Sequence, residues 1–331
     1  MKLSYISSYR FVGGDASWQI VYEWEDILSR DLSLQIRGES ALTKKIYAAI
    51  ARFGLLSLYN TLLPKKKLKL RFLSIDNVKP NALLNKNCIP VIIDFWLNKK
   101  DFQLFFDNIK YVPLLLVTNR EVYDVLKLSN CPVPVEHFPL SFPDQYKIQK
   151  TSSFNKKYEF CMFGRPNPFF IRLLDKYCIN HPDFCYIINN GDINNRQYIS
   201  NNGDVVAVDT GRQSYIEMIR NTKISCYSTP GIDESKKVSS EYNQVTPRVF
   251  EMLCNGCQVI GHYPMAADTI WYNLNAVVPN VDDYAEFEKV LNFYRSTPAD
   301  IKKYSEFMSN HYTSKRSELL KQILKKYSIN I

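Results

Sequence analysis

Three runs of almost uninterrupted apolar residues restrict this chain more than any other feature. They cover residues 70–75, 89–95 and 112–118. Runs that stay apolar, instead of alternating with polar residues, are typical of strands in a parallel sheet that helices cover on both faces. Near the amino terminus, a short strand over residues 3–7, a glycine-containing loop and a helix over residues 18–30 form the opening unit of a doubly wound domain. We therefore expect an α/β fold with a parallel sheet.

A second series of the same kind follows a proline-rich stretch. A chain of 331 residues is long for one hydrophobic core and suits two. We expect a first domain over residues 1–145, a linker over 146–157, a second domain over 158–300, and a final helical segment over 301–331 that packs back toward the first domain.

The net charge of +9 is concentrated in one segment of the sequence. Between Arg30 and Arg71 the chain has ten basic residues and two acidic ones, Asp31 and Glu39, which gives this segment a charge of +8. A local basic excess indicates an anionic partner, such as a phosphorylated substrate, an anionic lipid or a nucleic acid. Aromatic residues are plentiful but form no recognisable RNA-binding signature, so a nucleic acid is the weakest of these choices.

Residues 41–63 predict one helix with an apolar side, and Lys65, Lys66 and Lys67 follow it closely. An apolar helix beside a lysine cluster is typical of a segment that lies on an anionic membrane. The alternative is a core helix followed by a solvated turn. No run of about 18 uncharged apolar residues is present, so we expect no membrane span. With no signal-peptide pattern either, we expect a cytoplasmic protein that contacts the inner face of the cell membrane through residues 41–71.

Most of the eight cysteines lie in apolar segments, which indicates reduced, buried thiols in a cytosolic protein. Cys254 and Cys257 have C-x-x-C spacing, but no second pair or suitably spaced histidine accompanies them, so we expect no zinc site. The pair also closes a predicted helix instead of opening one, which argues against a redox role.

The stretch TPRVFEMLCNGCQVIGHYP, residues 246–264, predicts a short helix that runs into a buried strand. Thr246 suits the N-cap, and Pro247 suits the first helical position. Arg248 and Glu251 are three residues apart and therefore share one face of the helix. A helix N-terminus binds phosphate, an arginine there adds a second contact, and a glutamate one turn in can accept hydrogen bonds from ribose hydroxyls. The alternative is an ordinary ion pair on the surface of a packed helix.

Several stretches of the sequence, taken together, resemble the conserved stretches of a known family. PRVFEMLCNGCQVI supplies a helix with a core Phe-Glu, a glycine turn and a strand, while FVGGDASWQIVYEWEDIL and YEFCMFGRPNP supply glycine loops in the two halves. HYTSKRSELLKQIL supplies a C-terminal helix. These stretches resemble glycosyltransferases of the GT-B fold, in particular the group 1 glycosyltransferases and the CgeB-like proteins. The resemblance implies two Rossmann-like parallel-sheet domains that face a central cleft, followed by C-terminal helices.

The same resemblance implies a nucleotide-sugar donor that is bound mainly by the second domain, with the acceptor on the side of the first. By position, Glu251 would bind the nucleotide ribose. Arg165 and Arg248 would contact the diphosphate, together with amides at the start of the helix that begins at Pro247.

Two positions depart from the pattern of that family. Many group 1 enzymes have a glutamate eight residues before the ribose-binding one, and here that position is Asn243. The lysine that usually follows the glycine-arginine loop is missing, because a Pro-Asn-Pro sequence occupies the region. Lys236 or Lys237 would have to substitute for it.

Glycosyl transfer needs a stabilised leaving phosphate, which arginine side chains and helix amides supply without a metal. The chain has no Asp-x-Asp triplet, so we expect neither an essential metal nor a cofactor. By resemblance, Gly13 and Gly14 let the backbone of the first domain approach the phosphates or the acceptor. An inverting enzyme also needs a general base, for which Asp15, Asp94 and His137 are the candidates in that order. Their structural alternatives are a helix cap, a turn former and a packed loop residue, and a retaining enzyme would need no such base.

These observations favour a hexosyl- or pentosyltransferase that moves a sugar from a nucleotide-sugar donor to a glycan or lipid-linked glycan, as in bacterial-type surface polysaccharide assembly. The first rival is another enzyme of the same architecture, such as a sugar-nucleotide epimerase or a transferase that uses a phosphosugar without a nucleotide. A basic nucleic-acid-binding protein is the weaker rival, because charge alone supports it.

Overall fold

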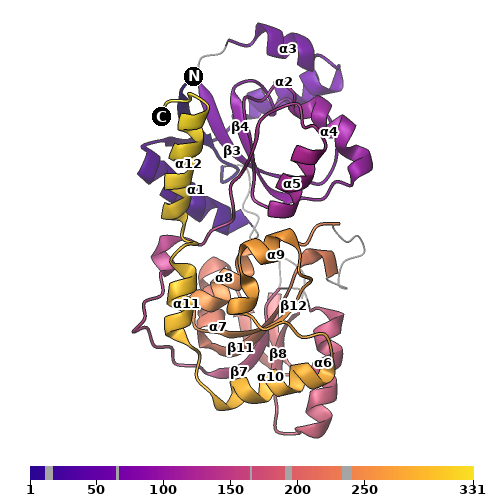
Figure 1. Ribbon diagram of the computed structural model, residues 1–331, viewed down its shortest axis with the longest axis vertical. Coiled ribbons are helices and arrows are strands. Elements are labelled where there is room, and N and C mark those ends of the chain that lie inside the picture. Colours follow the sequence, from indigo (N-terminus) through magenta and orange to yellow (C-terminus); the bar gives the residue numbers. More distant parts are fainter. Residues whose placement is uncertain (12–17, 65–66, 165, 191–195, 233–240) are drawn as a thin grey trace. The chain divides into compact units, whose positions relative to one another are not determined.

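The computed structural model describes residues 1–11, 18–64, 67–164, 166–190, 196–232 and 241–331 (Figure 1). The chain divides into two compact units, and each has its own six-stranded sheet. Unit 1 consists of Met1–Asp144, Ser240–Tyr242 and Thr313–Ile331. Unit 2 consists of Gln145–Ser239 and Asn243–Tyr312.

The sheet of unit 1 has the strand order β2-β1-β3-β4-β5-β6, and every neighbouring pair is parallel. Its strands are β1 (Leu3–Ser7), β2 (Gln35–Arg37), β3 (Leu68–Ile75), β4 (Cys88–Phe95), β5 (Leu115–Val117) and β6 (Val135–His137). Its α-helices are α1 (Gln19–Leu32), α2 (Ala41–Arg52), α3 (Leu56–Leu62), α4 (Phe102–Ile109), α5 (Arg120–Leu128) and α12 (Thr313–Lys326). The three apolar runs of the sequence form β3, β4 and β5, which confirms the predicted parallel sheet.

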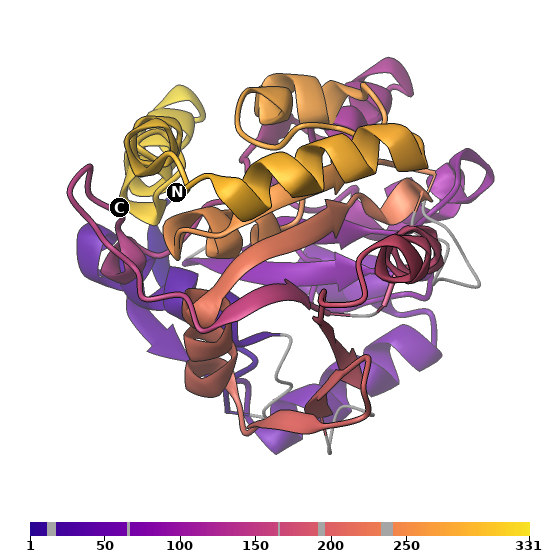
Figure 2. The same cartoon turned by 90° about the horizontal axis from the view of Figure 1, so that it is seen from below.

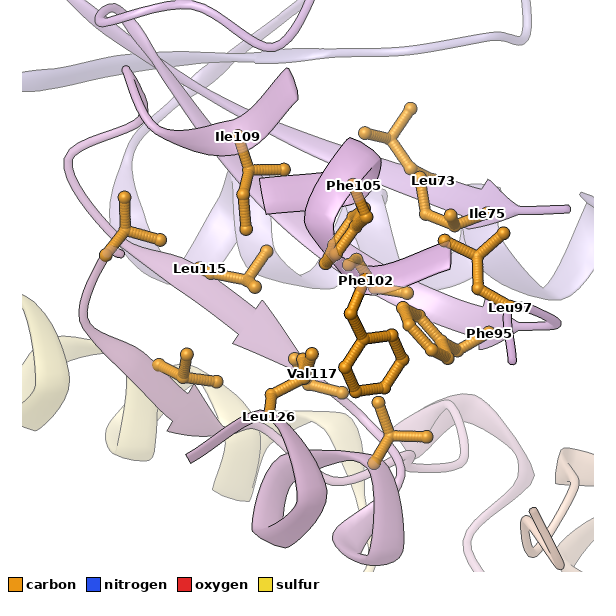
Figure 3. Packing of buried hydrophobic residues seen from close by; sticks show 14 of the residues in the cluster. Leu73, Ile75, Phe95, Leu97, Phe102, Phe105, Ile109, Leu115, Val117 and Leu126 are labelled. Atoms are coloured by element: carbon orange, nitrogen blue, oxygen red, sulfur yellow. The ribbon is translucent and has the colours of Figure 1, made fainter. Parts of the chain in front are cut away.

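One hydrophobic core of unit 1 lies between the strands β3 to β5 and the helices α4 and α5 (Figure 3). Phe95 from β4 meets Phe102 and Phe105 from α4 edge to face, with ring centroids 6.0 and 5.4 Å apart. Asn119 caps α5 by accepting a hydrogen bond from the Val122 amide at 3.0 Å. Apolar burial and this cap together hold the two helices on the sheet and keep the strand ends in place.

The last helix of the chain belongs to unit 1 and packs against its first helix. The Ser317 hydroxyl on α12 donates to Asp31 on α1 at 2.8 Å. Arg316 is buried and donates to the carbonyls of Pro139 and Leu140 at 2.8 and 3.1 Å. Residues 301–312, by contrast, belong to unit 2. The segment 301–331 is therefore shared between the two units.

The sheet of unit 2 has the order β10-β9-β8-β7-β11-β12, and it is parallel except where β9 pairs with β8 and β10. Its strands are β7 (Tyr158–Met162), β8 (Tyr186–Asn190), β9 (Arg196–Ser200), β10 (Val205–Asp209), β11 (Thr222–Ser228) and β12 (Gln258–His262). Its α-helices are α6 (Pro168–Asn180), α7 (Arg212–Asn221), α8 (Pro247–Cys254), α9 (Ala267–Trp271), α10 (Tyr284–Ser296) and α11 (Ile301–Met308).

The core of unit 2 packs α6 and α10 onto one face of its sheet (Figure 2). Phe160 and Ile260 from the strands meet Phe170 from α6 and Phe287 from α10, and all four are fully buried. The short helix α8 is buried from Val249 to Cys254. A helix with so little exposed surface is held rigidly, so its N-terminus is a fixed point of the unit.

The sequence predicts one helix over residues 41–63, and the structure shows two, α2 and α3. The break lies at Gly54, whose φ of 67° is a left-handed conformation that favours glycine. The single-helix prediction is therefore wrong at its centre.

Candidate functional site

The carboxyl ends of parallel strands meet at one edge of the unit 2 sheet. β7 lies between β8 and β11. The strands that follow β7 in the chain are added first on its β8 side and then, from β11, on its other side. The strand order therefore reverses at β7, which makes this edge a topological switch point. Open α/β sheets bind ligands at such a point. Asn167, in the loop after β7, donates from Nδ2 to the hydroxyl of Ser228 at the end of β11, at 2.9 Å. This hydrogen bond joins the two loops that border the switch point.

Gly164, directly after β7, brings an arginine side chain against the backbone. Its φ is 82°, and an added Cβ would overlap the guanidinium group of Arg248. Only glycine fits both the backbone conformation and the contact. Within the described part of the chain, Arg248 forms no hydrogen bond or ion pair. Arg248 therefore places its guanidinium group against the loop after β7, with donors that no described side chain uses.

Arg248 comes from the first turn of α8, and the start of that helix matches part of the prediction. Pro247 occupies the first turn, and Thr246 is the N-cap residue, but the Thr246 hydroxyl accepts no capping hydrogen bond. The Thr246 amide instead donates to the hydroxyl of Tyr227 at 2.9 Å. Thr246 is thus the N-cap residue as predicted, although its hydroxyl does not make the capping hydrogen bond.

Glu251, one turn further along α8, is held by two side chains that the sequence did not single out. It is only 5% exposed. Arg212 Nη1 donates to Oε1, and the hydroxyl of Tyr215 donates to Oε2 at 2.9 Å. Burial raises the pKa of Tyr215 well above its usual range, and the neighbouring carboxylate adds to this shift. Tyr215 therefore stays protonated and acts as a donor to Glu251.

The simple surface ion pair considered for Arg248 and Glu251 is not what the structure shows. Glu251 pairs with Arg212, while Arg248 lies against Gly164. Arg212 and Tyr215 are three residues apart at the start of α7, so they share one face of that helix. That spacing was visible in the sequence, but their contact with a residue 36 to 39 positions away was not.

Asn243 stands where the resemblance to group 1 glycosyltransferases led us to expect a glutamate. Asn243 Oδ1 accepts a hydrogen bond from the hydroxyl of Thr229 at 2.9 Å. It also lies against Gly231, where an added Cβ would overlap the amide group. Asn243 is thus packed on the segment that follows β11, at the same edge of the sheet.

An open groove of about 510 Å³ runs along α7 within unit 2. Its lining residues are Tyr146, Arg212, Gln213, Ile216, Glu217, Arg220 and Asn221. The Arg212 guanidinium lies 5.7 Å from the ring centre of Tyr146. Arg212 therefore lines this groove and also pairs with the buried Glu251.

Five of the predicted site residues lie outside the described residues. They are Gly13, Gly14, Asp15, Arg165 and Lys237, and the same holds for Lys236. The structure brings together Pro247, Arg248 and Glu251 on α8 in unit 2, and it places Asp94 and His137 in unit 1.

Asp94 and His137 lie toward the carboxyl ends of two strands of the same sheet. Asp94 is the penultimate residue of β4 and His137 is the last residue of β6. The His137 ring nitrogen Nε2 lies 3.3 Å from the carbonyl oxygen of Thr118. Burial, with the nearby charge of Arg120, lowers the pKa of His137 to about 4. His137 is therefore neutral near pH 7 and a weak base.

Sequence reasoning missed a buried carboxyl group in unit 1. Glu25 on α1 is 1% exposed and accepts a hydrogen bond from the hydroxyl of Ser8, just after β1. Arg10 contacts the same oxygen at 3.3 Å. Burial raises the pKa of Glu25 to about 7 against the opposing effects of Ser8 and Arg10. Glu25 is four residues after Val21 on the apolar face of α1, and that spacing was its only sequence signal.

No group of three or more histidine, cysteine or acidic side chains suited to a metal ion occurs among the described residues. All eight cysteines are free, and Cys254 and Cys257 are both buried. Burial raises the pKa of Cys257 to about 11. In the part of the chain that the structure describes, no helix is both long and apolar enough to cross a bilayer.

Sequence comparison finds no matching family model and no matching curated protein. Comparison of the fold with solved structures does give matches. The pneumococcal O-GlcNAc transferase GtfA, in complex with UDP and GlcNAc, has a TM-score of 0.51 at 10% identity, over 82% of this chain and 59% of that one. The chain thus spans about three fifths of the length of GtfA.

Two further structures match over most of both chains. The trehalose-6-phosphate synthase OtsA has a TM-score of 0.52 at 10% identity, over 98% of this chain and 90% of that one. The second, trehalose-6-phosphate from E. coli bound with UDP-2-fluoro glucose, has a TM-score of 0.52 at 11% identity, over 95% of this chain and 86% of that one. These proteins are GT-B glycosyltransferases. The fold is GT-B. This confirms the fold that the sequence motifs predicted, and identities near 10% extend the likeness to the fold alone.

Proposed function

We propose that this protein is a metal-independent glycosyltransferase whose unit 2 binds a nucleotide-sugar donor. One observation carries the proposal. At the switch point of the unit 2 sheet, the guanidinium of Arg248 lies against Gly164 without a hydrogen-bonding partner among the described residues, and the carboxylate of Glu251 follows one helical turn later. A cation at a helix N-terminus and an acceptor one turn further along match the diphosphate and the ribose of one nucleotide.

Glu251 has the acceptor capacity that a ribose requires. Each carboxylate oxygen offers about two acceptor sites. Arg212 uses a site on Oε1 and Tyr215 uses a site on Oε2, which leaves one on each oxygen for two ribose hydroxyls. The two donors also fix the orientation of the carboxylate before the nucleotide arrives, which lowers the entropic cost of binding.

Arg248 and the first-turn amides of α8 would stabilise the negative charge that develops on the leaving diphosphate. Arg165 and Lys237, or Lys236, are proposed as further contacts of that diphosphate. No step of this scheme uses a metal ion or a cofactor. Pro247 contributes by fixing the first turn of the helix in which those amides lie.

The structures of similar fold support the donor class. GtfA was solved with UDP and GlcNAc, and the E. coli structure with UDP-2-fluoro glucose. We extend this to the present chain as a nucleotide-sugar donor, with the acceptor proposed to be a glycan or lipid-linked glycan of surface polysaccharide assembly. The proposed location is the cytoplasm, at the inner face of the cell membrane. Gly13 and Gly14 are proposed to lie near the acceptor, with Asp15, Asp94 or His137 as the base of an inverting reaction.

A thermal-shift screen tests the donor class. UDP-, GDP-, CMP- and dTDP-sugars are each added to the wild type, to Arg248→Gln and to Lys289→Gln. Lys289 is an exposed lysine of α10, so its loss removes the same charge from unit 2 at another place. We expect at least one donor to raise the melting temperature of the wild type and of Lys289→Gln, and to have much less effect on Arg248→Gln. No response to any nucleotide-sugar would contradict the proposal and favour a donor without a nucleotide.

Transfer itself is tested by the release of free nucleotide from the donor that binds. Extracts of lipid-linked and soluble glycans serve as acceptors. Release that depends on an acceptor supports transfer, whereas a donor sugar that changes configuration without any release would indicate an epimerase.

A further inference from the structure

The helices α2 and α3 of unit 1 turn apolar side chains toward the solvent. Six large apolar residues between positions 42 and 62 are exposed by 45% or more. They are Leu42 (68%), Ile46 (48%), Phe53 (70%), Leu55 (45%), Leu58 (55%) and Leu62 (72%). Single exposed apolar residues are common in proteins, but six within one helix pair form a patch.

These residues form stripes with helical spacing. Leu42, Ile46 and Phe53 lie at positions i, i+4 and i+11, and the exposed Ala49 fills the position between them. Leu55, Leu58 and Leu62 lie at i, i+3 and i+7 around α3. Each stripe lies on one face of its helix, as in an amphipathic helix. The exposed face of the pair therefore carries both apolar stripes.

The opposite face of the pair is more covered and mixes apolar with polar side chains, and its tyrosines lie over a charged residue of the sheet. Lys69 in β3 is 3% exposed, and its Nζ lies 2.6 Å from Glu39. The same Nζ lies 5.4 Å from the ring centre of Tyr47 on α2, whose ring lies 6.0 Å from that of Tyr59 on α3. α2 and α3 therefore cover a buried ion pair with their tyrosines.

A second polar contact fixes α3. Asn60, which is 3% exposed, accepts a hydrogen bond from the amide of Lys86 at 3.0 Å and donates to the carbonyl of Leu56 at 2.9 Å. Asn87 also donates to the carbonyl of Pro64 at 2.8 Å. These polar contacts anchor the pair on its inner side, so the apolar stripes face outward in the folded unit.

The charge around the apolar stripes has a single sign. The sequence has no acidic residue from position 40 to position 75. Lys45 and Arg52 are exposed on α2, seven residues apart, and Lys67 is exposed after α3. The buried Lys69 and Arg71 are neutralised in part by Glu39, so they do not belong to this outer charge. Exposed basic residues beside an apolar stripe are the features of a helix that lies in an anionic membrane interface.

We propose that the outward face of α2 and α3 is a docking surface for an anionic lipid bilayer, with Leu42, Ile46, Phe53, Leu58 and Leu62 entering the acyl boundary and Lys45 and Arg52 contacting the headgroups. α2 has 12 residues and is therefore about 18 Å long at 1.5 Å per residue, well below the roughly 30 Å of a hydrocarbon core. The helix pair lies on the membrane and does not cross it. The inference stands on unit 1 alone and does not rest on the proposed donor site.

The charges and the exposed apolar residues of the α2 and α3 surface favour a bilayer over a nucleic acid or a second copy of this chain. A nucleic acid would use the lysines but would gain nothing from exposed leucines. A second copy of this surface would bring like charges together, because the surface carries no acidic side chain. An anionic bilayer is complementary to both the apolar stripes and the basic residues.

Cosedimentation of the full chain with vesicles tests the proposal. We expect binding to phosphatidylcholine vesicles that contain phosphatidylglycerol, and weaker binding to phosphatidylcholine alone. The double variant Phe53→Glu/Leu58→Glu is expected to lower the partition coefficient by more than tenfold. The matched control Phe293→Glu/Leu128→Glu changes residues that are 60% and 83% exposed on α10 and α5, and it is expected to bind like the wild type.

A second variant tests the charge contribution. Lys45→Gln/Arg52→Gln is expected to lose roughly fivefold in partition for each charge removed, and only with anionic vesicles. The control Lys321→Gln, on the exposed side of α12, is expected to keep its affinity. The variant Phe53→Trp adds a local probe, whose emission, measured against that of the wild type, is expected to shift to the blue when anionic vesicles are added. Near-ultraviolet circular dichroism verifies that every variant is folded.

Four results would overturn the proposal. Equal loss of binding in the matched controls would show that the surface of α2 and α3 has no special role. Binding to oligonucleotides without binding to vesicles would identify a nucleic acid as the partner. A dimer in light scattering that Phe53→Glu/Leu58→Glu dissociates, again without vesicle binding, would identify a second copy of the chain. In the Phe53→Trp variant, an added emission that stays unshifted on vesicles would equally exclude insertion of this surface.

Discussion

Replacement of Glu251 by glutamine is expected to weaken nucleotide binding strongly while it leaves the fold in place. The substitution keeps the size of the side chain but removes its charge and one of its two acceptor oxygens. Because Arg212 and Tyr215 already donate to the carboxylate, the ribose depends on the acceptor sites that remain. A hydrogen bond to a charged group is worth about 1.5–3 kcal/mol, which corresponds to a rise of roughly 10- to 150-fold in Kd.

Isothermal titration with nucleoside diphosphates measures this change directly. Tyr215→Phe is the matched control, because it removes a hydrogen bond from the same carboxylate and preserves the charge that the ribose would contact. We expect Tyr215→Phe to change Kd much less than Glu251→Gln. Urea unfolding of both variants separates a loss of binding from a loss of stability. An unchanged Kd in folded Glu251→Gln would refute the assignment of Glu251 to the ribose.

Further predictions concern the glycine loop, a buried acid and the absence of a metal requirement. Gly164→Ala forces an alanine to a φ of 82° and displaces Arg248, so we expect a loss of about 1–2 kcal/mol in urea unfolding and weaker nucleotide binding; a variant as stable as the wild type would contradict this. Folding raises the pKa of Glu25 from 4.5 to about 7. Between these two pH values the unfolded chain has lost the proton of Glu25 and the folded chain has kept it, so the free energy of unfolding falls as the pH rises. The stability of Glu25→Gln relative to the wild type should therefore increase between about pH 4.5 and pH 7, by on the order of 3 kcal/mol, and a constant difference would contradict the buried, protonated carboxyl. Nucleotide binding is expected to be unchanged by EDTA, and a loss that Mg²⁺ or Mn²⁺ restores would show a metal in the site.

The sequence predicted those features that depend on neighbouring residues in the chain. The apolar runs that form β3, β4 and β5 predicted a parallel sheet, because a strand buried on both faces has no polar alternation. The helix that begins at Pro247 and carries Arg248 and Glu251 was also found from local pattern. Local spacing was sufficient to propose the two residues as a pair of contacts for one ligand.

The partners of these residues could not be predicted, because tertiary packing decides them. Arg212 reaches Glu251 only because α7 and α8 pack together, and Arg248 reaches Gly164 only because the first turn of α8 lies near the loop after β7. Local pattern gives no information about which distant residues meet at a sheet edge.

The sequence pattern left the orientation of α2 and α3 open between a membrane-surface segment and a core helix. A core helix would bury Leu42, Ile46 and Phe53. The structure exposes them and instead places the ring of Tyr47 against the buried Lys69 of β3, whose charge requires polar cover. The contact with a neighbouring strand, which the helix pattern does not contain, shows which face is covered.

The location of a bound nucleotide tests the central claim most directly. A crystal structure of the chain with the nucleoside diphosphate that binds most tightly would reveal it. The proposed function predicts the ribose hydroxyls on the carboxylate of Glu251 and the diphosphate between Arg248 and the start of α8. A nucleotide that binds elsewhere in unit 2 and contacts neither Glu251 nor Arg248 would contradict it.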